Sequence, residues 1–125
     1  MLKNLICLGL AGGLGTLARY GIVELTKKLA GTSFPWGTAA ANLLGCFLAG
    51  LIWEITAKQI PISNQTRFII LVGFMGAFTT FSAFILETGN LARDSHWMGA
   101  IANVLFLNTA GIILLFIGIL FGRSF

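Results

Sequence analysis

Residues 73–84 read Gly73-Phe-Met-Gly-Ala-Phe-Thr-Thr-Phe-Ser-Ala-Phe84, within an apolar run that covers residues 68–86. Its two glycines and three hydroxyl residues weaken a helix, because glycine adds backbone freedom and hydroxyls compete for backbone hydrogen bonds. At lipid depth, Ser and Thr side chains can satisfy the backbone groups that a break releases. The stretch therefore predicts a spanning helix broken at mid-depth, and unwound carbonyls at such breaks bind monovalent cations in membrane proteins.

The composition of the whole chain supports a membrane setting. Of the 125 residues, 57% are hydrophobic and 10% are charged, and the mean hydropathy is +0.92. A soluble domain has about 25% charged residues, and a small globule needs them because its surface is large relative to its core. The composition therefore excludes a disordered chain, disfavours a soluble domain and makes an integral membrane protein the default interpretation. A spanning helix uses about 20 residues, so the chain has room for four spans but not for a fifth.

Four apolar stretches match that estimate, and the breaks between them contain nearly all the charge. They cover residues 4–25, 36–56, 68–86 and 97–121 of a single membrane domain, 1–125. Tryptophans lie near the predicted span ends, as interface anchors do, at Trp36, Trp53 and Trp97. The prediction is an all-α integral membrane protein with four transmembrane helices, of which the third is broken.

The basic residues give no nucleic-acid signature and no membrane orientation. The net charge is +4, but the cations are dispersed and form no patch that could follow a phosphate backbone. One membrane face receives Lys3, Lys58, Arg67 and Arg123, and the other receives Lys27, Lys28 and Arg93, with Arg19 just inside. This balance indicates either a weak topology signal or dual topology, in which copies insert both ways and pair antiparallel.

Several polar and aromatic residues at span depth have both a structural and a functional interpretation. Asn42 and Asn108 either bond between helices or line a polar track, in which an amide N–H could donate to an anion. Phe81 and Phe84 share a helix face, either as packing or with positive ring edges toward an anion. Arg19 either extends to the interface, attracts an anion or stabilises a dimer, and Glu87 lies in a vestibule or in water.

Three motifs together make the chain similar to a known family. They are Gly12-Gly13-x-Gly15-x-x-x-Arg19-Tyr20, Gly37-Thr38-x-x-x-Asn42-Leu43-x-Gly45 and Gly73-Phe74-x-Gly76-x-x-Thr79-Thr80-Phe81-Ser82-x-Phe84-x-x-Glu87. With these motifs, its length and its four spans, the chain resembles the CrcB/Fluc family of fluoride channels over essentially its whole length.

The resemblance implies a function, an assembly and a cofactor. The family forms antiparallel dual-topology homodimers in the prokaryotic cell (inner) membrane, with two fluoride pathways that lower fluoride toxicity by passive export. A structural sodium ion would be held by backbone carbonyls of Gly76 and Thr79 from both subunits.

The resemblance also assigns residues to the fluoride pathway. Phe81 and Phe84 would face the anion, while polar contacts would come from Asn42, Thr80, Ser82 and Asn108. Arg19 and Glu87 match structural or vestibular positions. The chain departs from the family at Ala83 and Ile85, where members often have hydroxyl residues.

Other functions fit the residues less well. A proton-coupled multidrug exporter needs a titratable carboxylate deep in a span, whereas Glu24, Glu54 and Glu87 all fall near predicted span ends. In a non-transporting membrane scaffold the glycines and phenylalanines would serve only packing. An enzyme needs a nucleophile–base pair or a metal cluster, and one histidine with no embedded carboxylate supplies neither.

Overall fold

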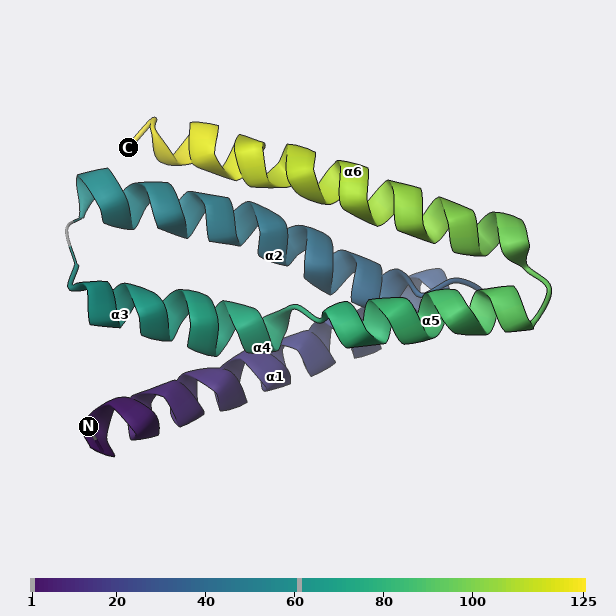
Figure 1. The fold of residues 1–125 in the computed structure, drawn as a ribbon, viewed down its shortest axis with the longest axis horizontal. Coiled ribbons are helices and arrows are strands. Elements are labelled where there is room, and N and C mark those ends of the chain that lie inside the picture. The colour runs from purple at the N-terminus through teal and green to yellow at the C-terminus, as the bar shows by residue number, and fades with distance from the viewer. Residues whose placement is uncertain (1, 61) are drawn as a thin grey trace.

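The chain folds into long helices joined by short connections, as a computed structural model of residues 2–60 and 62–125 shows (Figure 1). Among these described residues, four helical segments are long and apolar enough to cross a membrane: Leu2–Ala30, Trp36–Lys58, Asn64–Arg93 and Trp97–Gly122. The prediction of an all-α chain with four such helices is therefore confirmed.

The four segments differ in how regular they are. The first is helix α1 (Leu2–Ala30) and the fourth is helix α6 (Trp97–Gly122). The second is α2 (Trp36–Glu54), which continues as a π-helical turn, η1 (Ile55–Gln59). The third consists of α3 (Asn64–Phe68), the π-helical η2 (Ile69–Met75), α4 (Gly76–Phe78) and α5 (Phe81–Arg93).

Two helical segments extend well past the apolar stretches that predict them. The first continues to Ala30 instead of residue 25, and the third runs from Asn64 to Arg93 instead of 68–86. Backbone hydrogen bonds sustain a helix regardless of side-chain polarity, so polar residues at the ends continue the helix after the hydropathy has fallen. Glu87 consequently lies within α5, six residues before its end, and not at a helix terminus.

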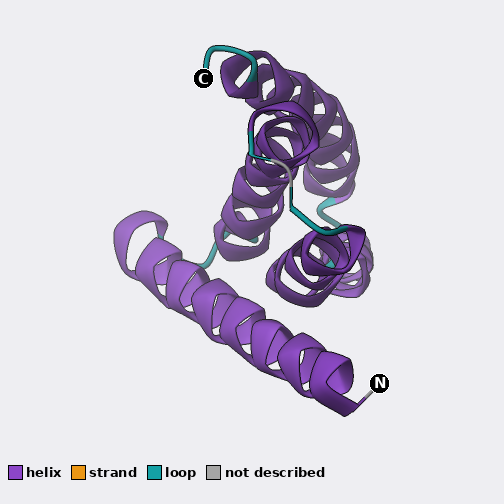
Figure 2. Ribbon diagram, turned by 90° about the vertical axis from the view of Figure 1, so that its left-hand side faces the viewer, coloured by secondary structure: helices purple, strands orange, loops and turns teal. Residues whose placement is uncertain are grey.

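Helix α2 lies between α6 and the third segment, while α1 crosses the others on one face (Figures 1 and 2). The most extensive packing joins α2 to α6. There a Cβ at Gly50 would overlap the carbonyl oxygen of Leu115, and one at Gly118 would overlap that of Phe47. Small residues let helix backbones approach closely in membranes, so these two glycines set the distance between α2 and α6.

The side-chain core is small and lies along α2. One cluster of buried residues joins α2 to the third segment through Ala41, Met75 and Phe78. A second cluster joins α2, α5 and α6 through Ala39, Phe84 and Leu107. Most large apolar side chains on α1 and α6 are exposed instead, as suits helices whose solvent is lipid. The core therefore surrounds the place where α4 gives way to α5.

Candidate functional site at the junction of α4 and α5

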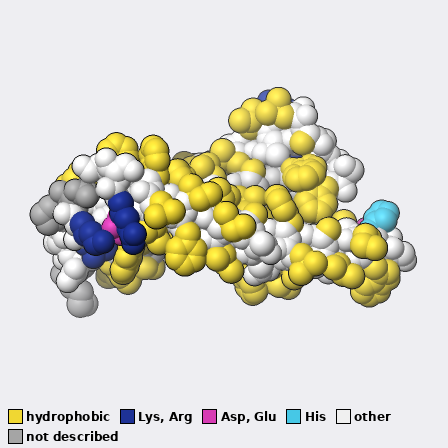
Figure 3. Space-filling model, turned by 90° about the horizontal axis from the view of Figure 1, so that it is seen from above, with side chains coloured by type: hydrophobic (Ala, Val, Ile, Leu, Met, Phe, Trp, Pro, Cys, Tyr) yellow, Lys and Arg dark blue, Asp and Glu magenta, His cyan; other side chains and the backbone are white. Residues whose placement is uncertain are grey.

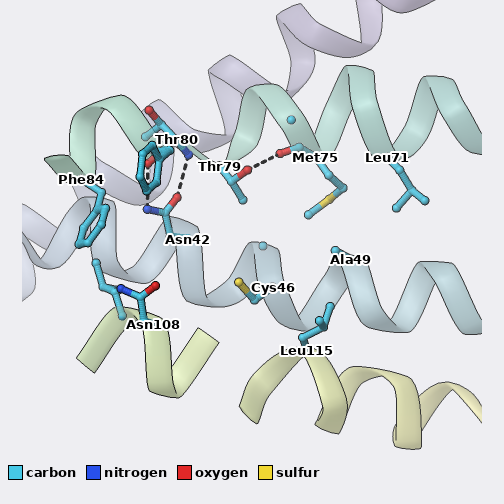
Figure 4. Close-up of a pocket in the computed structure, with 14 residues that line it drawn as sticks. Asn42, Cys46, Ala49, Leu71, Met75, Thr79, Thr80, Phe84, Asn108 and Leu115 are labelled. Atoms are coloured by element: carbon cyan, nitrogen blue, oxygen red, sulfur yellow. Dashed lines mark hydrogen bonds between the residues drawn. The ribbon is translucent and has the colours of Figure 1, made fainter. Parts of the chain in front are cut away.

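The helical backbone of the third segment is interrupted between α4 and α5. Thr79 (φ −89°, ψ 161°) and Thr80 (φ −153°, ψ 118°) are both extended. Asn42 of α2 binds both backbone groups of Thr80: its Oδ1 accepts from the N–H at 2.7 Å, and its Nδ2 donates to the carbonyl at 3.0 Å (Figure 4). A single amide side chain thus replaces the helical partners of the extended residue.

The same interruption releases two backbone carbonyls, those of Gly76 and Thr79. In a continuous helix they would accept from the N–H groups of Thr80 and Ala83, four residues further on. Here the N–H of Thr80 goes to Asn42, and that of Ala83 goes to the hydroxyl of Thr80, at 3.3 Å. Both carbonyls therefore lose their helical donors, and released carbonyls at a helix break are suited to a monovalent cation.

A hollow of about 410 Å³ lies beside the interruption, between α2, the third segment and α6 (Figure 4). Seven of the residues that the sequence predicts as site residues line it: Asn42, Gly76, Thr79, Thr80, Phe81, Phe84 and Asn108. The rest of its wall is mainly apolar, with the thiol of Cys46 and the side chain of Met75 among its lining. The hollow therefore combines an apolar and aromatic lining with a small number of polar groups, as ligand-binding sites do.

The two phenylalanines of the site occupy different environments. The ring of Phe84 is buried in the core beside Ala39, whereas Phe81 is 75% exposed. Their ring centroids are 5.8 Å apart and their planes are tilted by 50°. Because the edge of an aromatic ring is its electropositive part, tilted rings at a hollow can present edges to an anion.

Ser82 and Asn108 contribute less directly to the hollow. The hydroxyl of Ser82 lies 3.2 Å from that of Thr80, but Ser82 is exposed and is absent from the lining of the hollow. Asn108 lines the hollow from α6, and its Nδ2 donates to the carbonyl of Val104 in its own helix at 2.7 Å. The side-chain oxygen of Asn108 accepts no hydrogen bond from the described residues.

A second hollow, of about 400 Å³, lies toward the loops that precede α2 and α6. Within it the hydroxyl of Thr38 donates to Oε1 of Glu87 at 2.6 Å. The other carboxylate oxygen, Oε2, is buried and has no partner among the described residues. Lys27, Asp94 and His96 also line this hollow, which makes it a charged vestibule-like space.

The two hollows follow each other along the same pair of helices. Thr38 and Asn42 are one turn apart on α2, while Phe84 and Glu87 are one turn apart on α5. The contact of Thr38 with Glu87 and that of Asn42 with Thr80 therefore bracket the buried ring of Phe84. Each hollow thus has one polar contact between α2 and the third segment, and Phe84 lies between the two contacts along the chain.

The sequence left two hydrogen-bonded residues, Thr38 and Asn103, without a role, and one residue that it predicts as vestibular or structural, Arg19, lines neither hollow. Thr38 stood in a motif without a role, although its i, i+4 spacing from Asn42 was a usable signal. Asn103 is fully buried and donates to Thr88 at 2.9 Å, and only its polarity in an apolar span pointed to that contact. Arg19 lines neither hollow and forms no hydrogen bond or ion pair within the described chain.

Together the fold and the site define a multi-pass helical membrane protein with a hollow between its spanning helices, whose mainly apolar wall contains a few polar and aromatic side chains. Residues 6–119 match the family described as "CrcB-like protein, Camphor Resistance (CrcB)", and the chain belongs to that family.

Curated relatives cover nearly the whole chain. A protein of Solidesulfovibrio magneticus named "Fluoride-specific ion channel FluC" is 47% identical over 98% of each chain. Proteins with the same name from Nitrosococcus oceani and Desulforapulum autotrophicum are each 46% identical, over 94% and 98% of each chain respectively. Together with the four apolar helices, these bacterial sources identify the chain as a multi-pass membrane protein of the bacterial type.

Proposed function

We propose that the protein is a fluoride-selective ion channel that exports fluoride passively from the cytoplasm and thereby lowers its toxicity. The main structural support is the hollow that Asn42, Thr80, Phe81 and Phe84 line beside the helix interruption. The names of the relatives give the substrate. No step in this proposal requires catalysis or energy coupling, because the membrane potential itself expels the anion.

The chemistry of the hollow suits a small, strongly hydrated anion. Such an ion enters a narrow path only if donors replace its water. One N–H of the Asn42 amide serves Thr80, and its second N–H is available to the ion. Ring edges of Phe81 and Phe84 add positive partial charge, and the bonded hydroxyl pair of Thr80 and Ser82 keeps one O–H as a further donor. We place the pathway from this hollow past Phe84 to Thr38 and Glu87.

We infer that two copies assemble antiparallel, with dual topology. The support is that the hollow is open to the outside of the chain and that Phe81, a large apolar ring in its lining, is 75% exposed. A second copy would close the hollow. The near balance of Lys and Arg between the two faces removes any charge preference for one orientation.

A structural sodium ion at the dimer centre, with the interruption placed at mid-depth in the bilayer, completes the proposal. The released carbonyls of Gly76 and Thr79 fit such an ion, since their helical donors bind Asn42 and Thr80 instead. Two such pairs, one from each copy, would hold it. The ion would supply a fixed positive charge, and Asn42 would keep the backbone of Thr80 extended so that both carbonyls stay released.

Fluoride release from liposomes tests the channel. Purified protein is reconstituted with internal potassium fluoride, and efflux is started with valinomycin. We expect rapid fluoride efflux and little chloride efflux under matched chloride loading. A folded, dimeric preparation that releases no fluoride, or both anions alike, would overturn the proposal.

Cation exchange tests the sodium site separately. Protein purified in sodium is transferred to N-methylglucamine, and both dimer content and fluoride efflux are measured before and after sodium is restored. Loss of either property with recovery on sodium addition supports the site. Unchanged behaviour in sodium-free buffer, with trace sodium excluded by elemental analysis, contradicts it.

A further inference from the structure

A cluster of charged side chains lies where spanning segments end. The buried carboxylate of Glu54, at the end of α2, accepts from Lys58 Nζ at 2.8 Å and from Arg123 Nε at 3.3 Å. Lys58 is the last residue of the second spanning segment, and Arg123 directly follows α6. Figure 3 shows such a group at one end of the molecule, with basic side chains around an acidic one.

Arg67, near the start of the third segment, adds another cation at this end. Its Nη2 donates to the carbonyl of Thr56, and its guanidinium carbon lies 5.6 Å from the centre of the Trp53 ring. Its Nε is buried and has no acceptor among the described residues. We call Glu54, Lys58, Arg67 and Arg123 the interface cluster, in which cations outnumber the carboxylate and leave positive charge uncompensated.

The exposed cations of the interface cluster retain donors for an external anion. The side chains of Lys58 and Arg123 are 61% and 57% exposed. Within residues 2–60 and 62–125, Arg123 uses only Nε, toward Glu54, so both of its terminal amino groups lack a protein acceptor. A guanidinium with free terminal N–H groups matches the oxygens of a phosphate, and a neighbouring ammonium adds charge.

The surroundings of the cluster favour a lipid. Trp53 is 53% exposed beside Arg67, and Phe121 and Phe125, two residues before and after Arg123 in the sequence, are also exposed. Aromatic residues of this kind lie at the level of the headgroups in membrane proteins. Cations at the ends of spanning helices reach the same depth, where basic pockets bind anionic headgroups.

We propose that the interface cluster binds the phosphodiester of an anionic phospholipid, with Lys58 and Arg123 as the direct ligands. Glu54 positions both cations, and Arg67 on Trp53 keeps the neighbouring surface positive. The bound lipid would tie the end of α2 to the end of α6. This site lies at the opposite end of α2 from Thr38, so it is separate from the proposed fluoride pathway.

Lipid binding to the intact protein tests the proposal. The protein is placed in nanodiscs of phosphatidylcholine, or of equal parts phosphatidylcholine and phosphatidylglycerol, and retained phosphatidylglycerol is counted by native mass spectrometry. The test variant is Glu54→Gln/Lys58→Gln/Arg123→Gln, which removes the ligands without leaving a buried unpaired carboxylate. The matched control is Lys28→Gln/Arg93→Gln, which removes one lysine and one arginine at the other end.

We expect wild type and control to retain phosphatidylglycerol and the triple variant to bind it about fivefold to tenfold more weakly. Its thermal midpoint should also stop responding to phosphatidylglycerol. Equal retention by all three proteins would overturn the proposal, as would stabilisation by inorganic phosphate alone in phosphatidylcholine nanodiscs. A triple variant that loses fluoride efflux equally in both lipid mixtures would instead assign the cluster to ion entry and also overturn the proposal.

Discussion

The side chain of Asn42 holds both backbone groups of Thr80, accepting its N–H at 2.7 Å and donating to its carbonyl at 3.0 Å. This one residue of α2 thereby keeps the junction of α4 and α5 extended. It also diverts the N–H that would otherwise bind the carbonyl of Gly76. A residue that looks like a pore ligand is therefore first a clamp on the backbone.

Asn42→Ala should destabilise the protein and reduce fluoride efflux. The change removes two hydrogen bonds and leaves backbone groups of Thr80 without partners, a loss of about 2–4 kcal/mol. Thermal unfolding in detergent and liposome efflux would measure the two effects. Asn108→Ala is the stability control, because the Asn108 amide donates only to its own helix. Equal midpoints for Asn42→Ala and Asn108→Ala would contradict the clamp.

The two site phenylalanines should separate function from stability. Phe81→Ile alters an exposed ring and should leave the unfolding midpoint nearly unchanged, whereas Phe84→Ile reshapes the core and should cost about 1 kcal/mol. Both should lower fluoride efflux if both rings face the ion. Phe116→Ile, at an exposed site on α6 outside both hollows, should change neither the unfolding midpoint nor the fluoride efflux. Full efflux from folded Phe81→Ile and Phe84→Ile would remove the rings from the pathway.

Thr38→Val should reveal the role of the contact with Glu87. Without the hydroxyl, a partly buried carboxylate loses its donor, at a cost of about 1–3 kcal/mol. Thr38→Ser restores the donor and should recover both the midpoint and the fluoride efflux. The comparison of the two variants by thermal unfolding and flux decides the matter. If serine fails to rescue what valine loses, the hydrogen bond is not the cause.

A glycine-to-alanine substitution should have opposite effects at the contact between α2 and α6 and at an open position on α1. Gly50→Ala and Gly118→Ala place a methyl group against a backbone carbonyl of the facing helix, so each should separate the helices and lower the midpoint strongly. At Gly21, on α1, a Cβ would meet no atom of the described residues within 4 Å beyond its own helix backbone, so Gly21→Ala should be neutral or stabilising by about 0.5–1 kcal/mol. Tolerance of alanine at both Gly50 and Gly118 would show that the two helices pack less closely than described.

Hydropathy predicted the four helices well because a bilayer imposes the same requirement on every span. It predicted their ends less well, since helical hydrogen bonds continue through Thr88 and Lys27 after the apolar run ends. For this reason the sequence predicts Glu87 at the end of the third span, whereas it lies inside α5. The dimer, the sodium ion and the depth of the extended residues in a bilayer stay predictions.

Sequence motifs brought most of the site together, but they did not show how its residues pair. Seven predicted residues line one hollow, while Glu87 lies in another and Arg19 in neither. Thr38 and Asn103 had no assigned role, because a polar residue in an apolar helix indicates a partner without identifying it.

The sequence by itself determined that this is an apolar, four-helix membrane chain and where its helices are weakest. These properties are sums of local terms: hydrophobic transfer along each span, and the backbone freedom of glycine and hydroxyl residues. Only the tertiary structure decided that Asn42 binds Thr80, 38 positions away, and that Thr38 binds Glu87, 49 positions away. Hydrogen bonds between helices depend on how the helices pack, and no local pattern specifies that geometry.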